Sequence, residues 1–481
     1  MAVSLLHSCD EDFLVEDPKG SMSPDGFFAS KTDLDLAITA LYHSVSRMHY
    51  QSAILAIQMG ADDMTTHPAS NKDHFREFDK FEVSAANSRL KNVYNPAWRA
   101  VWDATYFINN YEKTPTDRAT LDFYGGQAHF IRALAYFKLV RGWGKIPIIE
   151  DNVIDLEIEL REIAEVYELI VDDLKKAEAM LKDKMDDLRV RPHKGSAKAM
   201  LAEVYLTMAG WPLNKGTEYY ALAAEKAGEV IQNTSLYGVS LEEDYARLWQ
   251  FDNYNSTEIM FAAFFNMYLP TSEDMFNMLA PNAGKAEEDA GGWSDFCMEL
   301  QFYADFPENY RKTVTVKDTI KNKHFSEIGI GHPFYRKWEQ GESRANWYSG
   351  RTVYIWRLAH TYLTFAEARA RSGQLDASAE EALNVIRRRA HNVPLNAPSV
   401  YDIKGLTATE FADVVVAERG WEFCAEPEGR WWDLVRLEKV EEVVARRSPM
   451  EAITIDVEVA KIHYHFPFIE TDQLLNPNLK R

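Results

Sequence analysis

Residues 196–231 and 358–390 share one pattern, in which two helices joined by a short break carry small residues at fixed offsets. Small side chains at such offsets let stacked helical hairpins approach closely, as in a tetratricopeptide repeat. Generic antiparallel helices are the alternative, because alanine is common in any helix. We expect Ser196 to cap the first helix. The pattern is carried by Leu201, Ala202, Tyr205, Ala221, Ala224, Ala227 and Ile231 in the first copy and by Phe365, Ala366, Gly373, Ala382 and Val385 in the second.

The spacing of apolar residues predicts two further hairpins, one pairing 33–59 with 96–112 and the other pairing 126–142 with 164–181. The first of these helices should begin near Thr32. We therefore predict a mainly α fold. It consists of a tetratricopeptide-like scaffold of about four helical hairpins and a loop-rich irregular half that carries short strands.

Changes in composition along the chain suggest how one domain over 1–481 is laid out. Residues 60–93 mix acids, bases and amides, which predicts a long irregular loop. Residues 257–265 (TEIMFAAFF) form either a strand or a short helix. The expected parts are an N-terminal tether (1–30), the helical scaffold (31–232 and 357–440), a loop-rich ligand-binding region (233–356) and an extended C-terminal tail (441–481).

The stretch 418–436, ERGWEFCAEPEGRWWDLVR, places acids, arginines and tryptophans at a corner between two short helices. The helix break falls at Pro427 and Gly429. One interpretation is a pair of catalytic carboxyls of the glycosidase kind. The other is a structural ion network, which we favour because three arginines alternate with three acids and leave little unpaired negative charge. The residues concerned are Glu418, Arg419, Glu422, Arg430, Asp433 and Arg436.

Composition excludes several classes of partner. A net charge of −21 disfavours nucleic acid and anionic membrane surfaces. No run of apolar residues is long enough to predict a spanning helix.

Cys9, Cys297 and Cys424 are too few and too scattered for a disulfide framework or a metal knuckle. The chain also lacks phosphate-loop, G-x-S-x-G and H-E-x-x-H motifs, so we predict no cofactor and no metal.

Aromatic residues in irregular segments are the main signal for a ligand site. An exposed aromatic ring can stack on the apolar face of a sugar, while amide and charged side chains bind its hydroxyl rim. For any one tryptophan the alternative is that it covers the core beneath a loop. The candidate glycan-binding residues are Trp293, Trp347, Tyr348 and Asn346, together with Asp63, Asn71 and Arg76 of the first long loop.

The corner 418–436 resembles the C-terminal signature of the SusD/RagB family of outer-membrane nutrient-binding lipoproteins. GGQAHFIRALAYFKLVRGWGKIPII, RPHKGSAKAMLAEVYL and YIWRLAHTYLTFAEARARSG extend the resemblance over nearly the whole chain. Residues 306–312 (FPENYRK) depart from it, because the family usually has Asp-Pro-Arg there. In the family the corner is structural, and the ligand site is formed by loops over the helical scaffold. No site residue of this chain carries over by motif.

The resemblance implies a non-catalytic protein at the cell surface of an outer membrane. It would bind an oligosaccharide or polysaccharide and pass it to a SusC-like TonB-dependent transporter. Its only attachment to the membrane would be a lipid on Cys9, which resembles the first residue of a mature lipoprotein. Two alternatives stay open. One is an α-helical glycoside hydrolase that uses Glu418, Glu422 or Asp433, and the other is a peptide-binding repeat scaffold.

Overall fold

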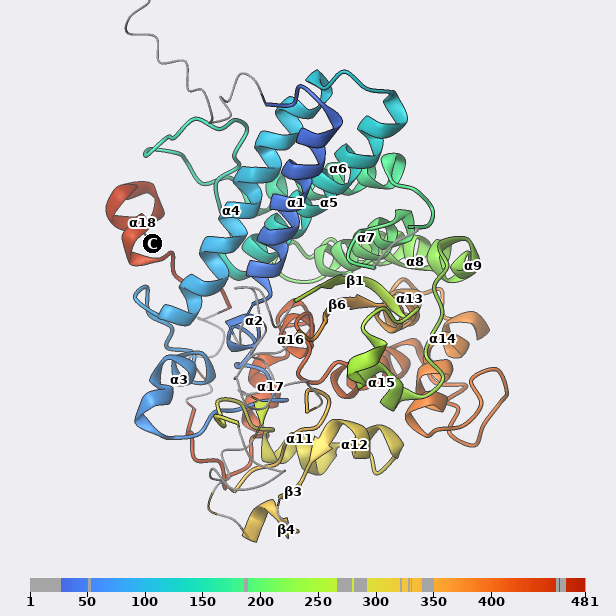
Figure 1. Cartoon of the computed structure of the whole chain (residues 1–481). Helices are drawn as coiled ribbons and strands as arrows, with labels where there is room; N and C mark the ends of the chain where they lie inside the picture. Colours follow the sequence, from blue (N-terminus) through green and yellow to red (C-terminus); the bar gives the residue numbers. More distant parts are fainter. Residues whose placement is uncertain are drawn as a thin grey trace, which may run out of the picture.

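The computed structural model describes residues 27–480 apart from 51–52, 186–188, 266–278, 281–291, 321, 328, 330, 340–349, 456–457 and 459–463. Helices dominate it and pack as successive pairs (Figure 1). The four predicted pairings are confirmed, since α1 packs against α4, α5 against α6, α7 against α8 and α13 against α14. The paired helices are α1 (Lys31–Met48), α4 (Ser88–Asn110), α5 (Arg118–Trp143), α6 (Ile163–Met180), α7 (Lys194–Ala209), α8 (Thr217–Gln232), α13 (Leu358–Arg371) and α14 (Ala377–Ala390).

Capping side chains explain where several helices begin. The side chain of Asn87 accepts hydrogen bonds from the backbone amides of Arg89 and Leu90, and that of Asp117 accepts one from Thr120. These caps start α4 and α5 about a turn or more before the apolar period becomes clear. Ser196 is not the N-cap residue of α7, which is His193, but it takes part in the cap, because its hydroxyl accepts from the His193 amide at 3.1 Å. It lies in the first turn of α7, and its hydroxyl donates to the Met260 carbonyl at 2.5 Å.

The prediction of one long loop over 60–93 is wrong. This segment contains a 3-10 turn (Ser70–Lys72), the helix α3 (Asp73–Asp79) and the start of α4. Phe75, Phe78 and Phe81 are buried, so three aromatic side chains anchor a stretch whose polar composition suggested solvent. The short helix α2 (Ala53–Ala56) precedes it.

The loop-rich half carries short strands, as predicted. Strand β1 (Ile259–Ala263) pairs antiparallel with β6 (Val353–Arg357), which settles the 257–265 stretch as a strand. Every residue of both strands is buried, because they lie beneath the helical scaffold. Besides short 3-10 turns, the other described elements of this half are α9 (Thr234–Tyr237), α11 (Leu300–Asp305), α12 (Tyr310–Thr315), β2 (Val316–Lys317) paired with β5 (Phe334–Tyr335), and β3 (Thr319–Ile320) paired with β4 (Lys323–His324).

The sequence suggested an extended C-terminal tail, but this part of the chain also contains helices. After α15 (Ala408–Glu422), α16 (Arg430–Arg436) and α17 (Val440–Ala445), the chain ends in α18 (Glu470–Leu475) and a 3-10 turn (Pro477–Leu479). Phe466 and Phe468 hold this end on the scaffold, with ring contacts to Trp143 and Tyr94 respectively. Figure 1 shows α18 beside the α4 end of the molecule. The division into tether, scaffold and ligand-binding region stays a prediction.

Candidate functional site

The corner between α15 and α16 buries its carboxylates. Glu422 is 0% exposed and lies between Arg389 at 2.8 Å, Arg311 at 3.0 Å and Arg357 at 3.1 Å. Burial alone would raise the pKa of the Glu422 carboxyl, but the three guanidinium groups lower it below its ordinary value. Glu418, one turn earlier, pairs with Arg311 at 2.7 Å. Neither carboxylate faces solvent, and Glu422 stays ionised near neutral pH because its pKa is lowered.

The third acid of the predicted network, Asp433, joins another buried cluster. Its carboxylate accepts from Arg419 at 2.7 Å and from Arg436 at 2.8 Å. Arg419 also forms an ion pair with Glu203 of α7 at 3.1 Å, and Arg436 also forms one with Glu367 of α13 at 2.6 Å. The cluster therefore ties α16 to two helices of the repeat scaffold.

The last arginine of the predicted network points to a different part of the chain. Arg430 forms a bidentate pair with Asp62, with bonds of 2.7 and 3.0 Å. Beside it, the Gln58 side chain donates to the Pro427 carbonyl and accepts from the Gly429 amide. Glu428 pairs with Lys138 and Arg141 of α5 at 2.6 and 2.5 Å. The corner is thus joined to α5 and to the segment around Gln58 and Asp62.

These contacts define the chemistry available at the corner. A glycosidase needs two accessible carboxyls, one of which keeps a proton. Here the carboxylates are closed off by guanidinium groups on α12, β6, α14 and α15. The partners Arg311, Arg357 and Arg389 could not be identified from the sequence, because they lie between 33 and 111 residues from Glu422.

Segment 60–93 and the segment after Gly292 lie side by side. Thr65 and Cys297 form an antiparallel bridge with backbone hydrogen bonds of 2.8 and 2.9 Å. The Thr66 hydroxyl donates to the Asp295 carbonyl at 2.7 Å, and the Lys72 ammonium pairs with the Asp295 carboxylate. Segment 60–93, which holds Asp63, Asn71 and Arg76, is therefore brought to the segment that carries Trp293.

The predicted ligand residues of this region differ in accessibility. Asn71 is exposed, and Trp293 is partly buried against the core. Arg76 is half-buried, donates to the Ala69 carbonyl and pairs with Asp73. Asn346, Trp347 and Tyr348 lie outside the described residues, as does Cys9.

Asp63 is a supporting residue beneath the loop rather than a surface one. It is 2% exposed, and its carboxylate accepts from the Ala425 amide at 3.1 Å. Its carbonyl accepts from the Tyr335 hydroxyl at 2.7 Å. Burial raises the pKa of the Asp63 carboxyl to about 7. This residue links the loop to the turn that follows α15.

None of the described helices combines the length and the apolar character that crossing a lipid bilayer requires.

Two family models match the chain. One, described as starch-binding and associating with the outer membrane, matches residues 12–206. The other, described as the SusD family, matches residues 331–463. SusD-like protein P2 of Formosa agariphila is 27% identical over 460 residues, which cover 89% of this chain and 88% of that protein.

Solved structures share the fold. A SusD homolog from Bacteroides thetaiotaomicron matches with a TM-score of 0.81 and 20% identity over 95% of this chain and 97% of its own. A complex with xylogluco-oligosaccharide has a TM-score of 0.75 and 22% identity over 93% of this chain and 97% of its own. A laminarin-binding SusD-like protein has a TM-score of 0.75 and 23% identity over 93% of this chain and 98% of its own. The two family models, which between them match more than half of the chain, and the similarity to SusD-like protein P2 show that the chain belongs to the SusD family.

Proposed function

We propose that this chain is a non-catalytic cell-surface protein that binds an oligosaccharide or polysaccharide and delivers it to a SusC-like TonB-dependent transporter. SusD family proteins are associated with the outer membrane at the cell surface, which supports the location. The observation that carries glycan binding is the likeness of nearly the whole fold to two structures that bind xylogluco-oligosaccharide and laminarin. The buried corner supports the absence of catalysis there, because its carboxylates are paired.

The glycan surface that we propose lies where segment 60–93 meets the segment after Gly292. Trp293 would offer an aromatic face for stacking, and the exposed Asn71 amide would bind hydroxyl groups. Trp347, Tyr348 and Asn346 would complete it. Asp63 and Arg76 would hold the loop in place, since both have partners within the protein.

Calorimetry with xylogluco-oligosaccharide and laminarin oligosaccharides tests this surface. The double variant Trp293→Ala, Trp347→Ala should lose at least about tenfold in affinity, because stacking on two aromatic rings is removed. The matched control is Trp98→Ala on α4, which removes another partly buried indole outside these loops. Unchanged binding in the double variant, or an equal loss in the control, would refute the site.

Attachment and delivery need separate tests. A lipid on Cys9 predicts that Cys9→Ala moves the protein from the membrane fraction to the soluble one and removes the acyl mass in mass spectrometry. Delivery predicts that the detergent-extracted protein co-purifies with a TonB-dependent transporter. Glycan binding without either result would leave a binding protein but remove the delivery function.

A further inference from the structure

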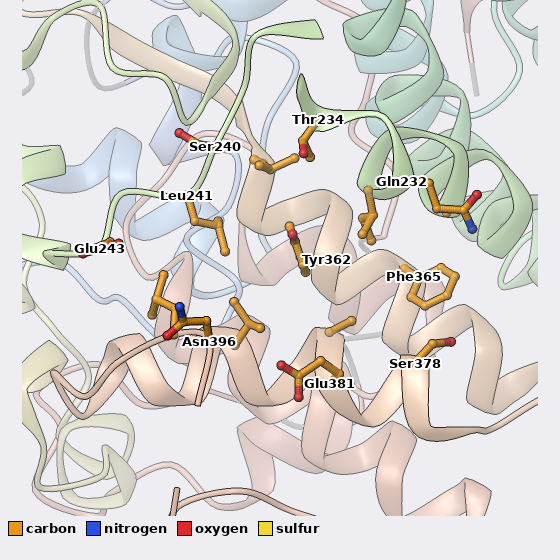
Figure 2. Close-up of a pocket in the computed structure, with 16 residues that line it drawn as sticks. Gln232, Thr234, Ser240, Leu241, Glu243, Tyr362, Phe365, Ser378, Glu381 and Asn396 are labelled. Carbon is orange, nitrogen blue, oxygen red and sulfur yellow. The ribbon is translucent and has the colours of Figure 1, made fainter. Parts of the chain in front are cut away.

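A groove runs between α8 and α14, and α13 forms its floor (Figure 2). Its first part is a cavity of about 540 Å³. Tyr362 and Phe365 of α13 lie in the middle of the view, between Gln232 of α8 and Glu381 of α14. Both aromatic rings are only partly buried, so the floor presents apolar surface to the groove.

A second cavity extends the groove along α8. It measures about 690 Å³ and shares Gly228, Gln232, Phe365 and Ser378 with the first. It reaches Glu218 at the start of α8. At a rise of about 1.5 Å per residue, the wall from Glu218 to Gln232 is about 21 Å long, which corresponds to roughly four turns of a peptide helix.

The lining acids fall into two groups. Glu229 pairs with Lys198 and Lys226, Asp376 with Arg369, and Glu381 with Arg388. Glu218, Glu225 and Glu243 are exposed, and their side chains make no ion pair or hydrogen bond with any other described residue. Arg369, the basic residue among the described lining residues, is already paired. The rim therefore keeps three uncompensated negative charges.

The spacing of these charges fits one kind of occupant. Glu218 and Glu225 are seven residues apart, so they lie on the same face of α8 about 10.5 Å from each other. A helix lying in the groove could place its apolar stripe on Tyr362 and Phe365 and its basic residues against these carboxylates. Apolar stripes in grooves and complementary charges at the rim are how amphipathic helices are recognised.

We propose that the groove between α8 and α14 is a docking site for a cationic amphipathic helix of a partner protein. The site is separate from the loops to which we assign glycan binding. It goes beyond the proposed function, because three uncompensated carboxylates favour a cationic partner, whereas a neutral glycan has no charge to pair with them. Charge complementarity selects a basic partner over an acidic one.

A synthetic helix of about 14 residues, with leucines on one face and lysines on the other, is the probe. Fluorescence anisotropy with the full chain should give saturable binding of one peptide per protein. The triple variant Glu218→Gln, Glu225→Gln, Glu243→Gln should weaken it roughly tenfold, since three exposed ion pairs are lost. Ser378→Trp, at an exposed position shared by both cavities, should also weaken it by filling the groove.

The control variant removes the same charge elsewhere: Glu159→Gln, Glu168→Gln, Glu442→Gln, three exposed acids outside the groove. It should change the affinity less than about twofold, because the net charge alone is not the determinant. Equal weakening by both triple variants would overturn the proposal, as would unchanged binding in Ser378→Trp. Loss of oligosaccharide binding in the groove variants, with peptide binding intact, would make the groove a glycan site instead. Circular dichroism checks that each variant is folded.

Discussion

The corner between α15 and α16 and the groove between α8 and α14 use acidic residues in opposite ways. In the corner, Glu422 is fully buried and met by three arginines. In the groove, Glu225 is exposed and no described residue pairs with it. Pairing charges away from water fixes helices relative to one another, whereas leaving them unpaired at a rim keeps them available to a partner. The difference separates scaffold from interaction surface.

The largest expected effect is a loss of stability when the ion pairs of the corner are broken. Glu422→Gln keeps the side-chain shape but leaves Arg389, Arg357 and Arg311 short of one negative charge. A buried pair broken on one side costs about 3–5 kcal/mol. Urea denaturation should show a loss of this size in the free energy of unfolding. A loss below about 1 kcal/mol would mean that the corner is not the clamp that its contacts describe.

The pH dependence of stability should change in Asp63→Asn. An aspartate has a pKa of about 3.9 in the unfolded chain, whereas burial raises the pKa of Asp63 to about 7 in the folded protein. The folded state therefore holds this proton more tightly, and the group lowers the free energy of unfolding as the pH rises from about 4 through about 7.

The wild-type protein should thus lose up to about 4 kcal/mol relative to Asp63→Asn across that interval, since one pKa unit corresponds to about 1.4 kcal/mol. Denaturation at a series of pH values measures the difference between the two proteins. Glu299, whose pKa burial also raises to about 7, is common to both and cancels. Parallel stability curves would contradict the burial of Asp63.

A smaller effect is expected where the corner meets α7. A Cβ atom added at Gly210 would lie 2.2 Å from the Arg436 carbonyl oxygen, which also accepts a hydrogen bond from the Trp211 amide at 2.9 Å. Because the obstacle is backbone, Gly210→Ala should cost about 1–3 kcal/mol. Gly329→Ala is the matched control, since nothing lies within 4 Å of its added Cβ. Thermal denaturation of the two variants should differ clearly.

The smallest effect on stability is expected for a substitution in the groove. Glu225→Gln makes the same chemical change as Glu422→Gln, but at an exposed and unpaired position. The free energy of unfolding should stay within about 0.5 kcal/mol of the wild type. The contrast between these two variants is the sharpest form of the comparison. A large destabilisation in Glu225→Gln would show that the groove acid is part of the scaffold.

The helical pairs could be predicted from the sequence because apolar periodicity is a local signal. Their starting points could not be fixed as well, since Asn87 and Asp117 cap α4 and α5 before the apolar pattern begins. Strand β1 stayed ambiguous because a fully buried strand has no alternation of polar and apolar residues. Its antiparallel partner β6 is far away in the sequence.

The candidate site was harder to predict for the same reason. The acids of 418–436 were visible as a cluster, but the partners of Glu422 come from α12, β6 and α14. Asp63 belongs to a polar stretch, yet it is buried because the Ala425 amide offers it a hydrogen bond. A peptide-binding repeat scaffold was one of the alternatives, but the residues that line the groove could not be named, since its walls come from two different hairpins.

The central claim is that the chain binds a glycan without cleaving it. Titration calorimetry with xylogluco-oligosaccharide and laminarin oligosaccharides, followed by mass spectrometry of the recovered sugar, tests it directly. The account predicts a saturable heat of binding for a glycan and recovery of that glycan at its original length. Recovery of shortened products, or no binding to any glycan tried, would contradict it.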